Sequence, residues 1–343
     1  MKVVILHDEI RPGAREDELD ALVQAEAIGA ALRGLGHECD AMGLTLDLGA
    51  GKDRLKRLAP DLVFNIVESL GGFAQLIHAA PALLDSLGIP YTGGSTEAMF
   101  LTSSKLLTKQ WLANAGLPTA PWVDEAGAVH GELRLPEWVI VKSSWEEASV
   151  GIEDDNVMDV SSMGELQSAM HRLSSRLGGC PFAERFIEGR EFNLSVLAGP
   201  NGPEVLPPAE IHFTDYPPGK PRIVNFAAKW RADAFEFHHT PRCFEFAPMD
   251  RPLLERLTRL SLECWSLFRL RGYARVDFRV DSTGQPWILE VNVNPCISPD
   301  AGFAAAGQQA AGLSYAEMIQ RIVADALVGV NGESRHAPSA RQK

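Results

Sequence analysis

The stretch that decides the fold is RVDFRVD-STGQP-WILEVNVNP, residues 275–295. Two runs in which polar and apolar residues alternate flank a turn sequence with a central glycine, which is the pattern of a β-hairpin. Successive side chains of a strand point to opposite faces, so Arg275 and Asp277 share one face of the first strand. Glu290 and Asn292 share one face of the second strand in the same way. The pattern therefore predicts that four polar groups converge on the hairpin.

These four groups suit a particular chemistry. Two carboxylates and an amide oxygen are hard oxygen ligands, which Mg²⁺ accepts while it keeps waters and shares the rest of its shell with substrate phosphates. An arginine beside them suits the charge that develops on a transferred phosphoryl group. A solvated sheet face with ordinary alternating charges is the alternative, and the hairpin alone does not decide between the two.

A second informative stretch lies upstream, where Lys142 ends the apolar run 138–141 and is followed by SSWEEASVG, residues 143–151. The backbone amides of such a small-residue loop can cover phosphates, so a lysine beside it suggests a nucleotide site. A lysine at a strand end is also compatible with an ordinary solvated charge. The sequence contains neither a Walker A motif nor Gly-x-Gly-x-x-Gly after the first strand.

The composition describes an acidic globular chain. Its 343 residues carry 45 Asp and Glu against 32 Lys and Arg, a net charge of −13, and 45% of them are apolar. The absence of a Lys/Arg block argues against a general nucleic-acid binder. The five cysteines include no Cys-x-x-Cys pair, which argues against a disulfide framework or a zinc site. No run approaches the roughly 18 apolar residues of a membrane span. We therefore expect a cytoplasmic protein that binds neither nucleic acid nor membrane.

The periodicity of apolar residues predicts mixed α/β and α+β structure in three parts. These parts are an open α/β domain, a small central domain and an α+β domain that holds the hairpin, over residues 1–101, 102–182 and 183–328 in turn. Helices are expected over 102–115 and 253–271, and strands around Ile211 and Phe226. Residues 329–343 are polar and without period, so we expect a frayed tail.

Several motifs follow one another along the chain. They are Lys105 and Lys109 on one helix, Lys142 with its loop, Glu184-x-x-Ile187-x-Gly189-x-Glu191, Arg275-x-Asp277, and Glu290-x-Asn292-x-x-Pro295. Their order resembles the ATP-grasp superfamily and, within it, the D-alanine–D-alanine ligase branch. The likeness extends from Val3 to about Leu327. It implies an ATP-grasp fold that binds ATP between the central and C-terminal domains and forms an amide through an acyl phosphate.

The resemblance also implies which residues bind the nucleotide. Phosphates would be held by Lys105, Lys142 and the loop that contains Ser149. Adenine would be held by Glu184 and by the backbone of Arg185, Phe186 and Ile187, and the ribose by Glu191. Lys229 would reach the terminal phosphate.

The remaining implied roles concern the metal and the transferred group. Asp277, Glu290 and Asn292 would bind two Mg²⁺ ions, with Mn²⁺ as an alternative ion. Arg275 would lie beside the transferring phosphoryl group, so Arg275 and Lys229 are the expected catalytic residues.

Departures from the family pattern gather around the substrate. The chain has IVESLGGF (66–73) where the family carries a His-Gly and Gly-Glu-Asp-Gly stretch, and EEASVG (146–151) where the family has Glu-Gly-Ser-Ser-Val-Gly. Trp230 replaces a tyrosine, PCIS (295–298) replaces Pro-Gly-Met-Thr, and Ala301 replaces a serine. We therefore predict an ATP-dependent amino-acid or peptide ligase, expected to be a homodimer, for small carboxylate and amine substrates other than two D-alanines.

Two alternatives remain open: a D-alanine–D-alanine ligase with divergent loops, and a non-catalytic nucleotide-binding regulator on the same fold. The residue that would hold a substrate ammonium is also open. Asp300 is one candidate, and Glu16 and Glu18, which follow the first strand, are two others.

Overall fold

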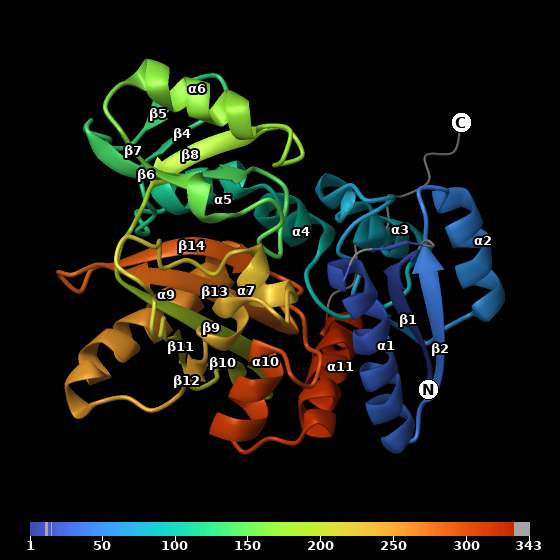
Figure 1. Ribbon diagram of the computed structural model, residues 1–343. Coiled ribbons are helices and arrows are strands. Elements are labelled where there is room, and N and C mark those ends of the chain that lie inside the picture. The colour runs from blue at the N-terminus through green and yellow to red at the C-terminus, as the bar shows by residue number, and fades with distance from the viewer. Residues whose placement is uncertain (11–12, 15, 333–343) are drawn as a thin grey trace.

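The computed structural model describes residues 1–10, 13–14 and 16–332 (Figure 1). Its N-terminal unit is a three-stranded parallel sheet in the order β2-β1-β3, which confirms the predicted open α/β domain. The strands are β1 (Lys2–Asp8), β2 (Glu38–Leu44) and β3 (Leu62–Asn65). The helices are α1 (Glu16–Gly34), α2 (Leu48–Leu58), the 3₁₀ turn η1 (Ala74–Leu76), α3 (Ala79–Leu87) and α4 (Thr96–Ser103). The run 3–6 is fully enclosed because β1 is the central strand.

The central unit is a five-stranded antiparallel sheet in the order β5-β4-β8-β6-β7. Its strands are β4 (Trp122–Val123), β5 (Val129–His130), β6 (Glu137–Ser143), β7 (Val157–Val160) and β8 (Pro181–Arg185). Its helical segments are α5 (Lys105–Asn114), η2 (Asp154–Asn156) and α6 (Met163–Leu173). Helix α6 covers the outer face of the sheet in Figure 1. Leu166, Met170 and Leu173 lie on its buried face at helical spacing.

The C-terminal unit is a six-stranded antiparallel sheet in the order β12-β11-β9-β13-β14, with β10 paired to β9. Its strands are β9 (Arg190–Gly199), β10 (Gly202–Val205), β11 (Ala209–Ile211), β12 (Arg242–Cys243), β13 (Tyr273–Val280) and β14 (Pro286–Asn292). Its helical segments are α7 (Phe226–Trp230), α8 (Phe235–His238), η3 (Pro248–Asp250), α9 (Arg251–Leu267), α10 (Gly302–Ala305), the π-helical η4 (Ala306–Ala310) and α11 (Tyr315–Gly332).

The predicted hairpin is strands β13 and β14. Arg275 pairs with Asn292 and Asp277 pairs with Glu290, so the four polar residues converge as expected, in a register that the sequence had left open. The register then shifts between Asp277 and Phe278, which pairs with Ile288. This β-bulge leaves Leu289 without a partner, and both Leu289 and Glu290 line the cavity described below.

Helices join the three units. Helix α5 lies between the central sheet and β14 in Figure 1, and its Leu112 packs in the same core as Ile288 of β14. Helices α1 and α11 come from opposite ends of the chain and share one core, in which Ile28 and Leu32 lie with Ile319 and Ile322. Helix α5 thus supports the hairpin from the central side, and the core of α1 and α11 joins the N-terminal unit to the C-terminal unit.

Three expectations about elements were wrong in detail. Phe226 begins helix α7 instead of lying in a strand, because the Asn225 side chain caps the backbone N–H of Ala228. The helix expected over 102–115 is interrupted at Ser104, whose hydroxyl caps the start of α5. The helix expected to reach residue 271 ends at Leu267.

The strands and helices also bear on where the domain boundaries and the predicted tail are best placed. Residue 182 lies inside β8, which pairs with β6 and β4 of the central sheet, and residue 101 lies inside α4. We therefore propose boundaries at Ser104 and after Arg185. Residues 329–332 continue helix α11, and the rest of the expected tail lies outside the described residues. Within the described chain, no helix is both long and apolar enough to cross a bilayer.

Candidate active site

A cavity of about 720 Å³ opens between the central and C-terminal sheets, and one end of it reaches helix α1. The thirteen residues with an implied role all line this cavity: Lys105, Lys142, Ser149, Glu184, Arg185, Phe186, Ile187, Glu191, Lys229, Arg275, Asp277, Glu290 and Asn292. They come from positions that are up to 187 residues apart in sequence, since the first is 105 and the last is 292. The fold therefore brings the predicted set together.

At the end formed by β6 and β8, Glu184 accepts hydrogen bonds from two lysines. Its Oε2 lies 2.6 Å from Lys109 Nζ and its Oε1 lies 2.6 Å from Lys142 Nζ. Burial raises the pKa of the Glu184 carboxyl, but the charges of Lys109 and Lys142 outweigh burial and hold it at about 2. Lys109 is only 1% exposed and also donates to Thr119 Oγ1. Sequence reasoning gave Lys109 no role, and its contacts make it a buried support for Glu184.

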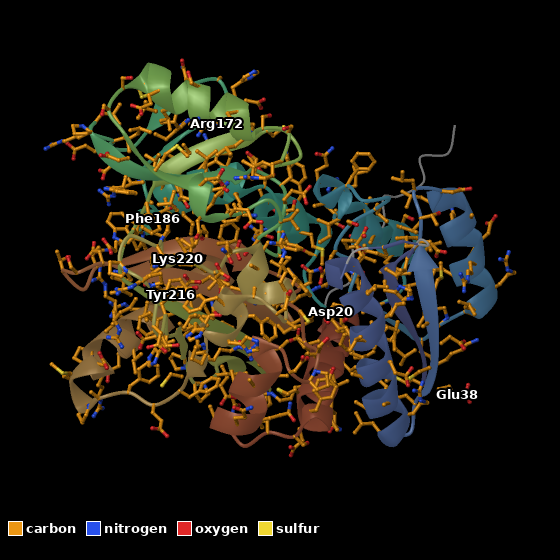
Figure 2. The ribbon with its side chains drawn as sticks, viewed as in Figure 1. Asp20, Glu38, Arg172, Phe186, Tyr216 and Lys220 are labelled. Carbon is orange, nitrogen blue, oxygen red and sulfur yellow. The ribbon has the colours of Figure 1, made fainter. Side chains whose placement is uncertain are left out.

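Next to this end, Glu191 forms an ion pair with Arg279. The distance from Arg279 Nη2 to Glu191 Oε2 is 2.9 Å, and the guanidinium lies over the ring of Phe186. Phe186 and Lys220 both lie where the central unit meets the C-terminal unit in Figure 2. Arg279, which sequence reasoning missed, thus fixes two of the residues predicted to contact the nucleoside.

The hairpin residues form a tight polar cluster. Arg275 donates through Nε and Nη2 to the two oxygens of Asp277, each at 2.7 Å. Asn292 Nδ2 donates to Glu290 Oε1 at 3.1 Å, and Asn193 of β9 donates to Asp277 Oδ1 at 2.8 Å. Such bidentate contacts hold the arginine plane in a fixed orientation. The predicted convergence of four polar groups is thus present.

Burial and charge set the protonation of this cluster. Burial raises the pKa of the Asp277 carboxyl, and the neighbouring charge of Arg275 offsets only part of that effect. Burial would also raise the pKa of Glu290, but the charges of Lys105, Lys229 and Arg275 together lower it. Lys229 has a lowered pKa because of its burial and then because of the charge of Arg275. The pKa values of the cluster are therefore set by burial and by the opposite charges of its own cations and carboxylates.

The cluster fits a divalent cation. Asp277, Glu290 and Asn292 present carboxylate and amide oxygens to one cavity, which is the donor set that Mg²⁺ and Mn²⁺ prefer. Within the described residues, no three His, Cys, Asp or Glu side chains are grouped so that they could hold a metal ion by themselves. Two carboxylates and one amide are a partial shell, and substrate phosphates and water complete such a shell in nucleotide enzymes.

The loop over residues 143–151 is fastened across the cavity by side chains. Lys105 Nζ donates to the backbone oxygen of Glu146 at 2.6 Å, and Trp230 Nε1 donates to that of Ala148 at 3.0 Å. Ser149 Oγ donates to the backbone oxygen of Val224 at 2.8 Å. Ala148 and Ser149 have φ angles of 54° and 62°, in the left-handed region that non-glycine residues rarely adopt. The loop therefore holds a strained shape through contacts with α5 and with the segment around α7.

Some cavity residues have no counterpart in the sequence-based set. Glu147 lines the cavity from this loop, where the related loop sequence has glycine; burial raises the pKa of its carboxyl, and the charge of Lys105 opposes that effect. Glu68 and Asp300 line the cavity as well. Asp300 was one candidate for binding a substrate ammonium, and its place in the cavity keeps it a candidate.

Helix α1 contributes an acid that sequence reasoning missed. Asp20 lines the cavity and accepts from Cys296 Sγ at 3.0 Å and from Ser298 Oγ at 3.3 Å. Figure 2 shows Asp20 where the N-terminal unit faces the C-terminal unit. Of the two acids expected here, Glu18 does not line the cavity, and the side chain of Glu16 lies outside the described part of the chain. Asp20 and Gln24, which accepts from Ile297 N, lie four residues apart on one helix face, a spacing that could have signalled this contact.

Comparison with known proteins agrees with this geometry. The family model described as "D-ala D-ala ligase C-terminus" matches residues 112–324. The D-alanine–D-alanine ligase of Moorella thermoacetica is 30% identical over an alignment of 345 positions, gaps included, and the alignment covers 94% of this chain and 98% of that protein. The ligase of Methylococcus capsulatus is 31% identical over an alignment of 315 positions, gaps included, which covers 90% of this chain and 92% of that protein.

Solved structures show the same fold. The D-alanine–D-alanine ligase of Bacillus anthracis complexed with ATP aligns with a TM-score of 0.71 at 21% identity, over 96% of this chain and 99% of that chain. The matched family model spans more than half of the chain, and the relatives cover nearly all of it. On this sequence match, together with the ATP-grasp arrangement of its sheets, the chain belongs to the D-alanine–D-alanine ligase family.

Proposed function

We propose that this ATP-dependent ligase joins a small carboxylate to a small amine, and that the pair is not two D-alanines. The donor carboxylate attacks the terminal phosphate of ATP, which gives an acyl phosphate and ADP. The amine then attacks the acyl carbon, and inorganic phosphate leaves as the amide bond forms. The observation that carries this proposal is the single cavity that holds both the Glu184 and the Asp277 clusters.

We assign the roles from the positions of the side chains. Lys105, which makes a 3.9 Å ion pair with Glu290, and Lys229 offset phosphate charge at the hairpin end. Arg275 stabilises the charge of the transferred phosphoryl group, since its guanidinium is already oriented by Asp277. Glu184, the backbone of 185–187 and Glu191 bind the nucleoside. In such a site catalysis consists of positioning and charge neutralisation.

The family uses a divalent cation, and we propose that Asp277, Glu290 and Asn292 hold two Mg²⁺ ions here. Bound there, the ions neutralise phosphate charge beside the reacting oxygens. These three side chains offer oxygen ligands that face the cavity.

The substrate assignment rests on the residues that replace family positions. The indole N–H of Trp230 donates to the backbone oxygen of Ala148, so this contact with the loop over 143–151 needs no tyrosine or serine hydroxyl. Ala301 places a methyl group in the cavity where the related sequence has a serine. These changes alter the polar groups that face the substrates, whereas the residues proposed to bind the nucleotide match the family pattern.

A screen of amine-dependent ADP release tests the proposal. Pairs of amino acids are incubated with ATP and Mg²⁺, and ADP and the amide product are measured together. We expect release that depends on both a carboxylate and an amine, and little release with D-alanine alone. Rapid turnover with D-alanine alone would favour a D-alanine–D-alanine ligase with divergent loops, and ATP binding without release under any pair would favour a regulatory protein.

A further inference from the structure

The loop over 143–151 carries a carboxylate to which the proposed function gives no role. Glu147 stands where the related loop sequence has glycine, and its side chain lines the cavity. Its carboxylate makes no hydrogen bond or ion pair with any residue that the structure describes. The carboxylates of Glu184, Asp277 and Glu290, in the same cavity, each form an ion pair with a lysine or an arginine. Glu147 is therefore a negative charge that no direct contact compensates within the described chain.

Hydrogen bonds hold the backbone on both sides of Glu147. On one side, Lys105 Nζ donates to the backbone oxygen of Glu146 at 2.6 Å. On the other side, Trp230 Nε1 donates to the backbone oxygen of Ala148 at 3.0 Å. Residue 147 therefore keeps its place at the cavity wall as long as these two bonds hold the loop.

The same contacts place Glu147 at the end of the cavity where the phosphates are expected. Lys105, which bonds to the neighbouring carbonyl, also lies with its Nζ 3.9 Å from Glu290 Oε2. Burial raises the pKa of the Glu147 carboxyl, and the charged groups that act on it are Lys105, Glu290, Arg275 and Lys229. In the proposed function these three cations face the phosphates and Glu290 holds the metal. Glu147 thus adds a negative charge beside the phosphates of a bound nucleotide.

This charge acts differently on two forms of the same nucleotide. Metal-free ATP brings the full negative charge of its phosphates, so a carboxylate beside them must either repel it or take up a proton, and both lower its affinity. Divalent cations neutralise much of the phosphate charge, so the same carboxylate repels a metal-bound nucleotide far less. The difference is larger inside a cavity than in open water, because the effective dielectric constant is lower there.

We propose that Glu147 selects metal-bound ATP over metal-free ATP and so keeps the cavity from filling with a nucleotide that cannot react. The inference rests on the proposed function, which puts the phosphates and the metal at this end. Glu147 is in this sense a specificity-determining residue, and it takes no part in phosphoryl transfer. Repulsion is favoured over direct coordination of the metal by Glu147, because no three acidic, His or Cys side chains of the described chain are grouped closely enough to hold an ion.

Isothermal titration calorimetry with a nonhydrolysable ATP analogue tests the inference, once with excess Mg²⁺ and once with EDTA. The ratio of the Kd in EDTA to the Kd in Mg²⁺ measures the selection. Glu147→Gln keeps the shape of the side chain and removes its charge, so it should lower this ratio by roughly 10-fold, mainly through tighter binding in EDTA. Glu147→Gly, which restores the residue of the related loop, should lower the ratio as well. Asp159→Asn removes one charge from an exposed position on β7, away from the cavity, and should leave the ratio unchanged.

The outcomes separate the inference from the function on which it rests. An unchanged ratio in both Glu147 variants, or equal Kd values with and without Mg²⁺ in the parent enzyme, would overturn the inference alone. Weaker binding of Glu147→Gln in Mg²⁺ would also overturn it, because Glu147 would then be a ligand of the cation. A parent enzyme that binds the analogue in neither condition would overturn the nucleotide site of the proposed function and the inference with it. A melting temperature for each variant shows that the fold persists, and Glu147→Gly provides the comparison should the glutamine variant not fold.

Discussion

At the scale of single residues, the oxygen cluster of the hairpin carries the chemistry. Asp277→Asn or Glu290→Gln removes one charged ligand but keeps the shape of the side chain, so each should abolish ADP formation with little change in circular dichroism. Asp233→Asn, at an exposed position away from the cavity, is the control. Near-normal turnover in both hairpin variants would refute the metal assignment.

Arg275 makes a separate prediction. Asp277 orients its guanidinium, and in the proposed mechanism the guanidinium stabilises charge that develops only in the transition state. Loss of Arg275 should therefore lower kcat more than it raises KM. Arg275→Ala should lose at least about 10²-fold in kcat, by comparison with removal of one charge-stabilising donor. Single-turnover measurement of ADP formation checks this. A variant with a raised KM for ATP and an unchanged kcat would show that Arg275 only binds.

Glu184 makes a prediction about pH and stability. Its folded pKa of about 2 lies below the ordinary glutamate value of 4.5, so the folded state binds fewer protons than the unfolded state between these values. The stabilisation by Glu184 is therefore fully present above pH 4.5 and is lost as pH falls toward 2, with a slope of up to about 1 kcal/mol per pH unit. Urea unfolding at pH 6.0, 4.5 and 3.5 should show a smaller acid-induced loss in Glu184→Gln than in the parent. Equal slopes would contradict the prediction.

At the scale of elements, the loop over 143–151 is a lid whose closure depends on few bonds. Trp230→Phe deletes the hydrogen bond to Ala148 O and keeps most of the ring, at a cost of roughly 0.5–1.5 kcal/mol. A less firmly closed lid should admit water to the acyl phosphate, so the amide formed per ADP should fall. Trp138→Phe, at a tryptophan that is 52% exposed, is the matched control. An unchanged ratio of amide to ADP in Trp230→Phe would show that this bond does not control closure.

Elements also show what sequence can and cannot predict. The β13–β14 hairpin was predictable because alternation and a turn sequence are local signals. Its register, which places Asp277 opposite Glu290, was not predicted. Helix α7 was predicted to be a strand because the apolar residues around Phe226 show no helical periodicity. The signal for the helix was the Asn225 side chain, which caps its N-terminus. Asp20 and Arg242 reach the cavity through contacts with Cys296 and Asp300. The i, i+4 spacing of Asp20 and Gln24 on α1 could have signalled the first contact, but neither partner segment can be read from a single sequence. The nucleotide residues, in contrast, formed motifs that a resemblance could supply.

At the scale of the whole molecule, the cavity is lined by residues from Asp20 to Gln309, so every unit of the fold contributes to it. The N-terminal helix α1 and the C-terminal helix α11 share a core, and Gln24 of α1 accepts from Ile297 beside the cavity. A ligand that bridges these units should therefore stabilise the assembly as a whole, because it binds the folded state and not the unfolded chain.

This arrangement predicts a metal-dependent thermal shift. A nonhydrolysable ATP analogue at 100 times its Kd should stabilise the fold by about 2.7 kcal/mol, and differential scanning fluorimetry would register it as a higher Tm. Part of the shift requires a divalent cation, because phosphate charges and the Asp277–Glu290 pair repel each other unless a cation lies between them. EDTA should therefore reduce the shift in the parent enzyme. In Asp277→Asn the shift should be smaller and nearly insensitive to EDTA, while Asp233→Asn should behave as the parent does. A shift of equal size with and without EDTA in the parent would mean that the hairpin carboxylates do not hold the metal that accompanies ATP.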